Sequence, residues 1–181
     1  FFNGTVFGGG TVFFNEATFG DGGVGFLDAT FGGGEVYFNY VDFGDGNVDF
    51  SGANFGDGPV YFQNATFGNG DVYFDDATFG DGNIEFSDAK FGEGRVNFAV
   101  NQFGKGILLF NGINCKSISF EKQQSKNKSK SSVSDLTTFS LRGANIDGPL
   151  ILNNLTFNCI PDLRSTKLSH HVDMDGLEVN L

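Results

Sequence analysis

Lysine and arginine are absent from Phe1 to Ala89, although fourteen aspartates and glutamates lie in that stretch, between Glu16 and Asp88. The complete chain of 181 residues has a formal net charge of −11. A surface this uniformly negative repels nucleic acid and anionic membranes. It attracts cationic partners or metal ions, or it only keeps a repetitive protein in solution. We therefore expect no direct contact with nucleic acid.

Cysteine and proline are also scarce. The two cysteines, Cys115 and Cys159, are too few for a disulfide framework and lack the spacing of a metal site, so we expect a reducing, cytoplasmic setting. There are 3 prolines but 28 glycines, which is typical of a chain that turns often through backbone conformations that glycine adopts at low cost.

Long apolar runs are missing as well. No run approaches the roughly 18 residues that a membrane helix needs, and no signal-peptide pattern is present. We expect no membrane segment within this fragment. The chain begins at Phe1, which indicates a mature or excised fragment whose flanking sequence can hold further targeting features.

Motifs for catalysis are absent too. His170 and His171 are the only histidines, and in a strand their side chains point to opposite faces, so surface or cap positions are expected for both. The segment from Gly20 to Gly25 satisfies the G-x-G-x-x-G pattern, but no helix is expected after it to receive a phosphate. The sequence predicts no enzyme and no catalytic, cofactor-binding or metal-binding residues.

The stretch from Thr5 to Phe110 contains a twelve-residue phrase that recurs with little change, as in Ala77–Asp88. Two phenylalanine series follow this period without a gap. One runs from Phe7 to Phe103 and the other from Phe14 to Phe110, each in steps of twelve residues. Residues fixed in position while their neighbours vary indicate a solenoid, in which each repeat covers the apolar face of the previous one.

Each repeat supplies two short apolar pairs at i and i+2, such as Ala17 with Phe19 and Val24 with Phe26. A spacing of two places both side chains of a pair on one face of a strand. The phenylalanines are separated alternately by seven and five residues, and the longer interval contains the Gly-x-Gly turn. The pattern predicts an all-β fold of short strands. Cys115 lies twelve residues after Phe103, so we expect it to be a small buried side chain.

In each repeat, the residue between valine and phenylalanine points outward. The way in which these outward residues sort onto faces indicates how many residues make one turn of the solenoid. If two repeats make one turn, Phe13, Tyr37 and Tyr61 form a ladder on one face, while Gly25 and Asp49 lie on another together with Tyr73, which breaks the sorting. A single repeat would leave only two short strands per turn. We therefore predict about 24 residues per turn, with four phenylalanines enclosed in each layer.

The five-residue interval carries a resemblance to a known family. The units from Val48 to Phe55 and from Leu141 to Gly148 resemble pentapeptide-repeat proteins, which occur in bacteria. The resemblance implies a right-handed, four-sided β-helix whose central residues stack inside, and it extends over most of the chain. The two extra residues in every second face depart from the strict five-residue register.

Three parts are expected along the chain. Residues 1–120 form the regular β-solenoid. Residues 121–138 form a polar loop, rich in lysine and serine, that is solvated or contacts a partner or the acidic side of the chain. In residues 139–181 the coil pattern returns and leads to a C-terminal cap, or a junction to a following domain, near Cys159–Arg164.

Several side-chain patterns have alternative interpretations. The oxygen ligands of Asp45–Asp49 and Asp81–Glu85 suggest weak calcium binding, but neither segment has the glycine of an EF-hand loop. The outward tyrosines are strand-favouring surface residues or a platform for stacking rings. A row of Thr18, Thr30, Thr66 and Thr78 suggests an ice-binding face, although Asp42, Asn54, Lys90 and Gln102 interrupt it.

The function most consistent with these patterns is a non-enzymatic β-solenoid scaffold that presents an acidic surface to another protein. The family resemblance implies an alternative, since some pentapeptide-repeat proteins mimic duplex DNA and act on a type II topoisomerase. No cofactor is expected. The sequence allows homo-oligomers and does not identify the protein partner.

Overall fold

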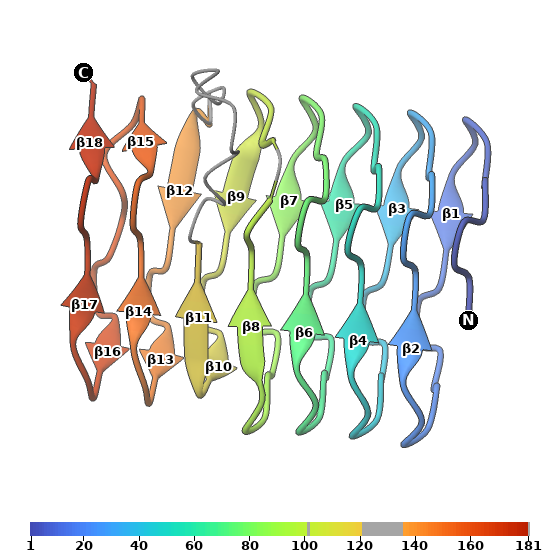
Figure 1. Cartoon of the computed structure of the whole chain (residues 1–181), viewed down its shortest axis with the longest axis horizontal. Helices are drawn as coiled ribbons and strands as arrows, with labels where there is room; N and C mark the ends of the chain where they lie inside the picture. Colours follow the sequence, from blue (N-terminus) through green and yellow to red (C-terminus); the bar gives the residue numbers. More distant parts are fainter. Residues whose placement is uncertain (101, 121–135, 181) are drawn as a thin grey trace.

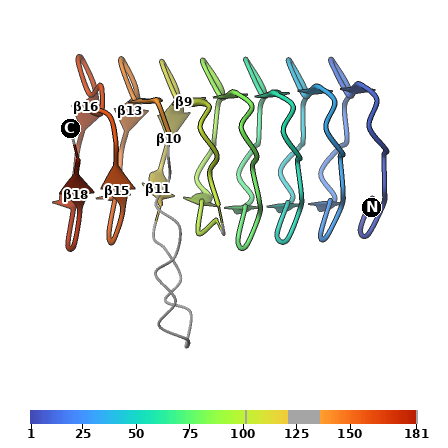
Figure 2. The same cartoon turned by 90° about the horizontal axis from the view of Figure 1, so that it is seen from above.

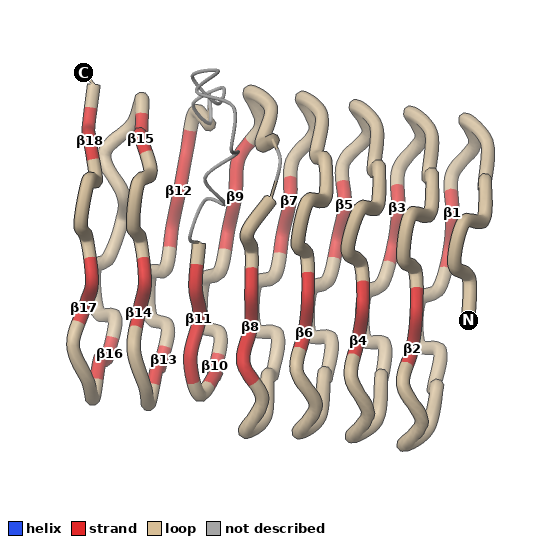
Figure 3. Tube along the Cα trace, in the orientation of Figure 1, coloured by secondary structure: helices blue, strands red, loops and turns tan. Residues whose placement is uncertain are grey.

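The computed structural model describes residues 1–100, 102–120 and 136–180. These residues form eighteen short strands and no helix (Figures 1 and 3), and every strand pairing is parallel. The strands stack along one axis as a β-solenoid of about six turns, and strands about 24 residues apart lie side by side. The predicted fold class is confirmed. We call each turn a coil.

Four faces follow one another around each coil, named A to D in chain order. Strands form where an apolar pair at i and i+2 lies between two turns, so most are only two residues long. Face A consists of β1 (Val12–Phe13), β3 (Val36–Tyr37), β5 (Val60–Tyr61), β7 (Ile84–Glu85), β9 (Ile107–Leu109) and β12 (Thr138–Ser140). Face C consists of β2 (Val24–Gly25), β4 (Val48–Asp49), β6 (Val72–Tyr73), β8 (Arg95–Asn97), β11 (Ser117–Ser119), β14 (Leu150–Ile151) and β17 (Val172–Asp173).

Faces B and D begin as ladders of single-residue bridges. Face B runs from Thr18 to Asn114 and continues as β10 (Asn114–Cys115), β13 (Asn145–Ile146) and β16 (Lys167–Leu168). Face D runs from Val6 to Gln102, and its later part is β15 (Thr156–Phe157) and β18 (Glu178–Val179). Figure 2 shows the coils from above.

The core is a set of phenylalanine stacks along the solenoid axis. One coil contributes Phe26, Phe31, Phe38 and Phe43, all fully buried, so the prediction of four enclosed rings per layer is confirmed. Each of these rings lies parallel to the corresponding ring of the next coil, with centroids 4.8 Å apart. Each buried phenylalanine contributes roughly 1.5 to 3 kcal/mol to stability. The stacks therefore hold successive coils together.

The Gly-x-Gly turns stack backbone on backbone. A Cβ at Gly56 would overlap the carbonyl oxygen of Gly32 in the preceding coil, and Gly56 also has a φ of +66°. A Cβ at Gly80 would likewise overlap the carbonyl oxygen of Gly56, although the φ of Gly80 is not positive. Close approach of neighbouring coils therefore requires glycine even where the backbone conformation does not.

The coil length changes toward the C-terminus. Val72 pairs with Val96, 24 residues later, but Val96 pairs with Ile118, 22 residues later. The difference is the two-residue insertion of one Gly-x-Gly turn, which the sequence lacks between Cys115 and Phe120. Leu150 pairs with Val172, again 22 residues later.

The described residues on either side of the expected polar loop belong to the solenoid. Leu136 is buried and β12 begins at Thr138, so the solenoid resumes inside the range assigned to the polar loop. A single leucine among polar residues gave no periodic signal. The segment around Asp162 pairs with Ser140, and β16, β17 and β18 complete a further coil, so the solenoid continues through the expected cap. The loop lysines Lys122, Lys126, Lys128 and Lys130 lie outside the described residues.

Candidate interaction surface

The fourteen acidic residues between Glu16 and Asp88 all lie on the outside of the solenoid, and none is buried. The register distributes them over faces A, B and C and over the corners, whereas the bridged row of face D from Val6 to Gln102 contains none. The acidic side chains of the first coils are thus spread over several faces and do not form one stripe.

These carboxylates have no cationic partners within the described part of the chain. The ion pairs found there are Lys116 with Glu93 and Asp147, and Arg164 with Asp162. All involve acids that follow Asp88. Among the described residues, the negative charge of the first coils is therefore not neutralised by ion pairs, and the charge of Arg95 acts on Asp71 only from a longer distance.

Many of the corner carboxylates bind the backbone of the next coil. The Asp45 side chain accepts hydrogen bonds from the backbone N–H and the side-chain amide of Asn69, both at 3.0 Å. The Asp81 side chain accepts one from the backbone N–H of Lys105 at 3.1 Å. Asn69 itself accepts one from the backbone N–H of Glu93, so aspartate and asparagine serve equally as acceptors.

Hydrogen bonds of this kind also involve residues for which the sequence suggested weak calcium binding, in Asp45–Asp49 and Asp81–Glu85. The side-chain oxygens of Asp45, Asn47 and Asp49 accept hydrogen bonds from Asn69, Asp71 and Ser51, and so each is directed to a different N–H group. No group of three or more histidine, cysteine or acidic side chains suited to a metal ion occurs among the described residues.

The threonines expected in one row lie in two rows. Thr18 and Thr66 are on face B, where they alternate with Asp42 and Lys90, whereas Thr30 and Thr78 are on face D. Because one coil takes two repeats, equivalent positions of successive repeats lie on different faces, and this divides the interrupted row of threonines between two faces. The ice-binding interpretation therefore has no support in the structure.

Both cysteines are free thiols. Cys115 is buried, as predicted, and burial raises its pKa to about 12. His170 and His171 are both exposed, in agreement with the expected surface positions. The glycines of the G-x-G-x-x-G pattern lie in a turn and in β2, and no helix follows them. The helix N-terminus that receives the phosphate in this motif is therefore missing here.

An aromatic ladder occupies the outward side of face A. The rings of Phe13 and Tyr37 are stacked with centroids 5.1 Å apart, and those of Tyr37 and Tyr61 with centroids 4.9 Å apart. The predicted sorting of Phe13, Tyr37 and Tyr61 onto one face is confirmed. The Tyr37 hydroxyl donates a 2.7 Å hydrogen bond to Glu35, and this bond is the main reason why the pKa of Tyr37 rises to about 12.

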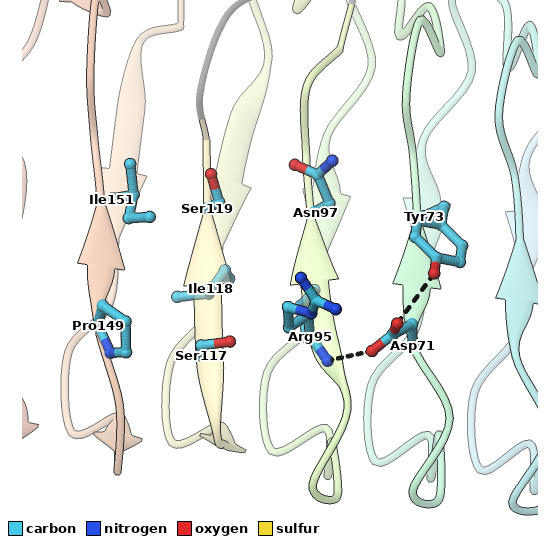
Figure 4. A pocket seen from close by; sticks show the side chains of 10 residues that line it. Asp71, Tyr73, Arg95, Asn97, Ser117, Ile118, Ser119, Pro149 and Ile151 are labelled. Atoms are coloured by element: carbon cyan, nitrogen blue, oxygen red, sulfur yellow. Dashed lines mark hydrogen bonds between the residues drawn. The ribbon is translucent and has the colours of Figure 1, made fainter.

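Face C contains a shallow groove of about 350 Å³ that the sequence did not indicate (Figure 4). The small side chains of Ser117 and Ser119 on β11 form its middle, between Arg95 and Asn97 on β8 and the apolar side chains of Pro149 and Ile151 at β14. The strands on either side of β11 lie 22 positions earlier and 32 positions later in the sequence, so no local pattern indicates the groove.

Asp71 and Tyr73 form the remaining edge of this groove. The Tyr73 hydroxyl donates a 2.9 Å hydrogen bond to Asp71, and the backbone N–H of Arg95 donates one of 2.7 Å to the same carboxylate (Figure 4). The bond from Arg95 lowers the pKa of Asp71, whereas burial and the bond to Asp71 raise that of Tyr73. The groove has the lower range of volumes typical of small-molecule sites.

Comparison with known families agrees with the geometry of the coils. Residues 45–90 match the family model for pentapeptide repeats (9 copies). We call residues 45–90 the pentapeptide-repeat segment, because they match this model. It includes the unit from Val48 to Phe55, whereas the unit from Leu141 to Gly148 lies outside the match. The pentapeptide-repeat segment covers 46 of the 181 residues, all within the longer coils that precede the change in coil length.

Curated proteins include no match to this chain. Among the described residues, no helix is long and apolar enough to cross a membrane.

Proposed function

We propose that this chain is a non-enzymatic solenoid scaffold whose acidic coils bind a cationic protein partner. The observation that carries the proposal is the set of fourteen outward carboxylates that lack ion-pair partners among the described residues. Uncompensated charge of one sign attracts oppositely charged partners over a distance of about one Debye length, roughly 8 to 10 Å at physiological salt.

The solenoid supports this role mechanically. Stacked phenylalanines fix the spacing between coils, and backbone hydrogen bonds to corner side chains such as Asp45 and Asp81 fix the turns. Charges that are held in fixed positions require little ordering when a partner binds. The pentapeptide-repeat segment, whose relatives are structural or interaction modules, favours a scaffold over a catalyst.

The proposal is tested with a dye-labelled octalysine peptide in a fluorescence anisotropy titration at several salt concentrations. We expect the affinity to fall steeply as salt increases. The triple variant Asp45→Asn/Asp57→Asn/Asp81→Asn should bind more weakly, because three charges are lost while the amide oxygens can still accept the backbone hydrogen bonds. The Asn69→Ala variant is the control for loss of such a hydrogen bond, since it removes the bond accepted from Glu93 but no charge, and it should bind the peptide like the wild type.

Two results would contradict the proposal. One is a wild-type protein that does not bind the peptide at low salt. The other is equal affinity of the triple variant and the wild type. A duplex DNA probe under the same conditions should show no binding, because both molecules are negatively charged.

A second function, inhibition or protection of a type II topoisomerase by DNA mimicry, is favoured by one observation. The pentapeptide-repeat segment at residues 45–90 lies almost entirely within the part of the chain that lacks lysine and arginine. A DNA supercoiling assay with gyrase separates the two functions. A DNA mimic must suppress or protect the reaction at micromolar concentration, whereas a scaffold for another partner leaves it unchanged.

A further inference from the structure

The aromatic ladder of face A is exposed at a position where the fold does not require aromatic residues. Phe13 is 68% exposed, and it lies in the same outward row as Tyr37, Tyr61, Glu85 and Leu109. The corresponding row of face C has Gly25, Asp49, Tyr73 and Asn97, so it contains a single aromatic residue among them. Since glycine, aspartate and glutamate are accepted at equivalent positions, strand formation does not account for three consecutive aromatic rings.

The rings form a narrow apolar ribbon. Because Tyr37 is stacked between Phe13 and Tyr61, both of its ring faces are covered, and the ribbon presents ring edges to solvent. Sugars and planar ligands bind to open ring faces, so the stacked arrangement does not suit them. Ring edges arranged in a row instead offer a surface on which aliphatic side chains can pack.

Two carboxylates lie next to the ribbon, one beside Tyr37 and one at the end of the row after Tyr61. Glu35 accepts the hydrogen bond from the Tyr37 hydroxyl, and Glu85 is the register partner of Tyr61 on the next strand. The negative charges of Glu35 and Glu85 both reach Tyr61, where they add to the effect of burial in raising the pKa of that phenol.

A fourth exposed aromatic residue lies near the end of face A. Tyr40 is 62% exposed at the corner where face A ends, and its φ of +58° is the left-handed conformation. The same corner position has Asn64, Asp88 and Gly112 in later coils, which are residue types that adopt this conformation more readily. Glu16 has the same conformation at this corner of the preceding coil, so the corner accepts larger side chains, and Tyr40 adds exposed aromatic surface there.

We propose that this aromatic ribbon, defined as Phe13, Tyr37 and Tyr61 on face A, docks a segment of the partner in which apolar and basic residues alternate. The inference rests on the proposed function and specifies the binding face and the chemistry of the partner. Apolar side chains pack along the ring edges, and lysine or arginine side chains pair with Glu35 and Glu85. Charge complementarity selects this occupant, because Phe1 to Ala89 contains no basic residue that could pair with these carboxylates.

The test compares two dye-labelled octapeptides that have the same charge, one alternating lysine with leucine and the other alternating lysine with serine. We expect the lysine–leucine peptide to bind wild-type protein about tenfold more tightly, which corresponds to the packing of a few apolar groups. The Tyr37→Thr/Tyr61→Thr variant should bind both peptides with the lower affinity. Threonine favours strands, and circular dichroism verifies that the variant is folded.

Two further variants keep the test decisive. Phe13→Thr changes a largely exposed side chain, so it preserves the fold and should reduce the preference for the lysine–leucine peptide about threefold. Tyr73→Thr removes an outward tyrosine of face C and should leave the preference unchanged.

The outcomes separate the two proposals. If the wild type binds both peptides equally well, the charge-based function stands but the ribbon is not a docking site. If the preference survives in Tyr37→Thr/Tyr61→Thr, or disappears in Tyr73→Thr, the docking site is not on face A and the inference is overturned. If neither peptide binds, the proposed function fails, and the ribbon proposal fails with it.

Discussion

Replacing Phe62 with alanine removes one ring from the centre of the solenoid. Phe62 is fully buried and stacks between Phe38 and Phe86, with centroid distances of 4.8 and 4.5 Å, and two more rings meet it edge-on. Truncation of a buried phenylalanine costs about 3 to 5 kcal/mol, because apolar contacts are lost and a cavity remains. We expect Phe62→Ala to lower the free energy of unfolding by that amount.

The matched control is Phe13→Ala, the same chemical change at an outward position of face A. Phe13 is 68% exposed and stacks on Tyr37 alone, so its loss should cost only about 0.5 to 1.5 kcal/mol. Urea denaturation followed by circular dichroism gives both values, provided that the slopes of the two transitions agree. Equal losses for the two variants would refute the assignment of inward and outward phenylalanines.

Three further predictions concern the turns and the titrating groups. In urea denaturation, Gly8→Ala should lower the free energy of unfolding by roughly 1 kcal/mol, and Gly56→Ala by several times as much. The reason is that a Cβ at position 56 overlaps a backbone carbonyl, whereas a Cβ at position 8 does not. Similar losses for the two variants would contradict the close stacking of turns. Hydrogen bonds from the Arg164 side chain are the main reason why the pKa of the Asp162 carboxyl is lowered to about 2. The ionised carboxylate should therefore stabilise the folded protein above the unfolded pKa near 4, and this contribution should be lost as the pH falls through 2. An NMR titration should show this midpoint, and Arg164→Ala should return it toward the ordinary value. Cys115 should react with a thiol reagent at pH 8 far more slowly than half-buried Cys159, and denaturant should remove the difference.

The sequence was sufficient to predict the solenoid because its strongest signals are periodic. The unbroken phenylalanine series identified the inward positions, and the sorting of Tyr37 and Tyr61 onto one face showed that two repeats, not one, make a turn. Cys115 was correctly placed inside because it continues the same series. These features depend only on spacing along the chain, which a single sequence contains.

Features that depend on contacts between coils could not be predicted in the same way. Glycine in the turns was attributed to backbone conformation, but Gly80 is needed because the carbonyl of Gly56 occupies the space of a Cβ. The ladder of corner side chains that cap the next coil, and the groove at β11, also depend on neighbours in other coils that are distant in the sequence. The single threonine row was predicted from the period of one repeat, whereas a turn of two repeats divides these threonines between two faces.

Disulfide trapping tests the two-repeat turn most directly, in a background with Cys115 and Cys159 replaced by alanine. Thr30 and Asn54 are bridge partners on face D, where neighbouring strands are about 4.8 Å apart, a separation that a disulfide can span. The double variant Thr30→Cys/Asn54→Cys should form an intramolecular disulfide on mild oxidation, detected by mass spectrometry after alkylation. Thr30→Cys/Asp42→Cys, with positions on different faces, should keep both thiols free. Oxidation of the second pair in preference to the first would contradict a turn built from two repeats.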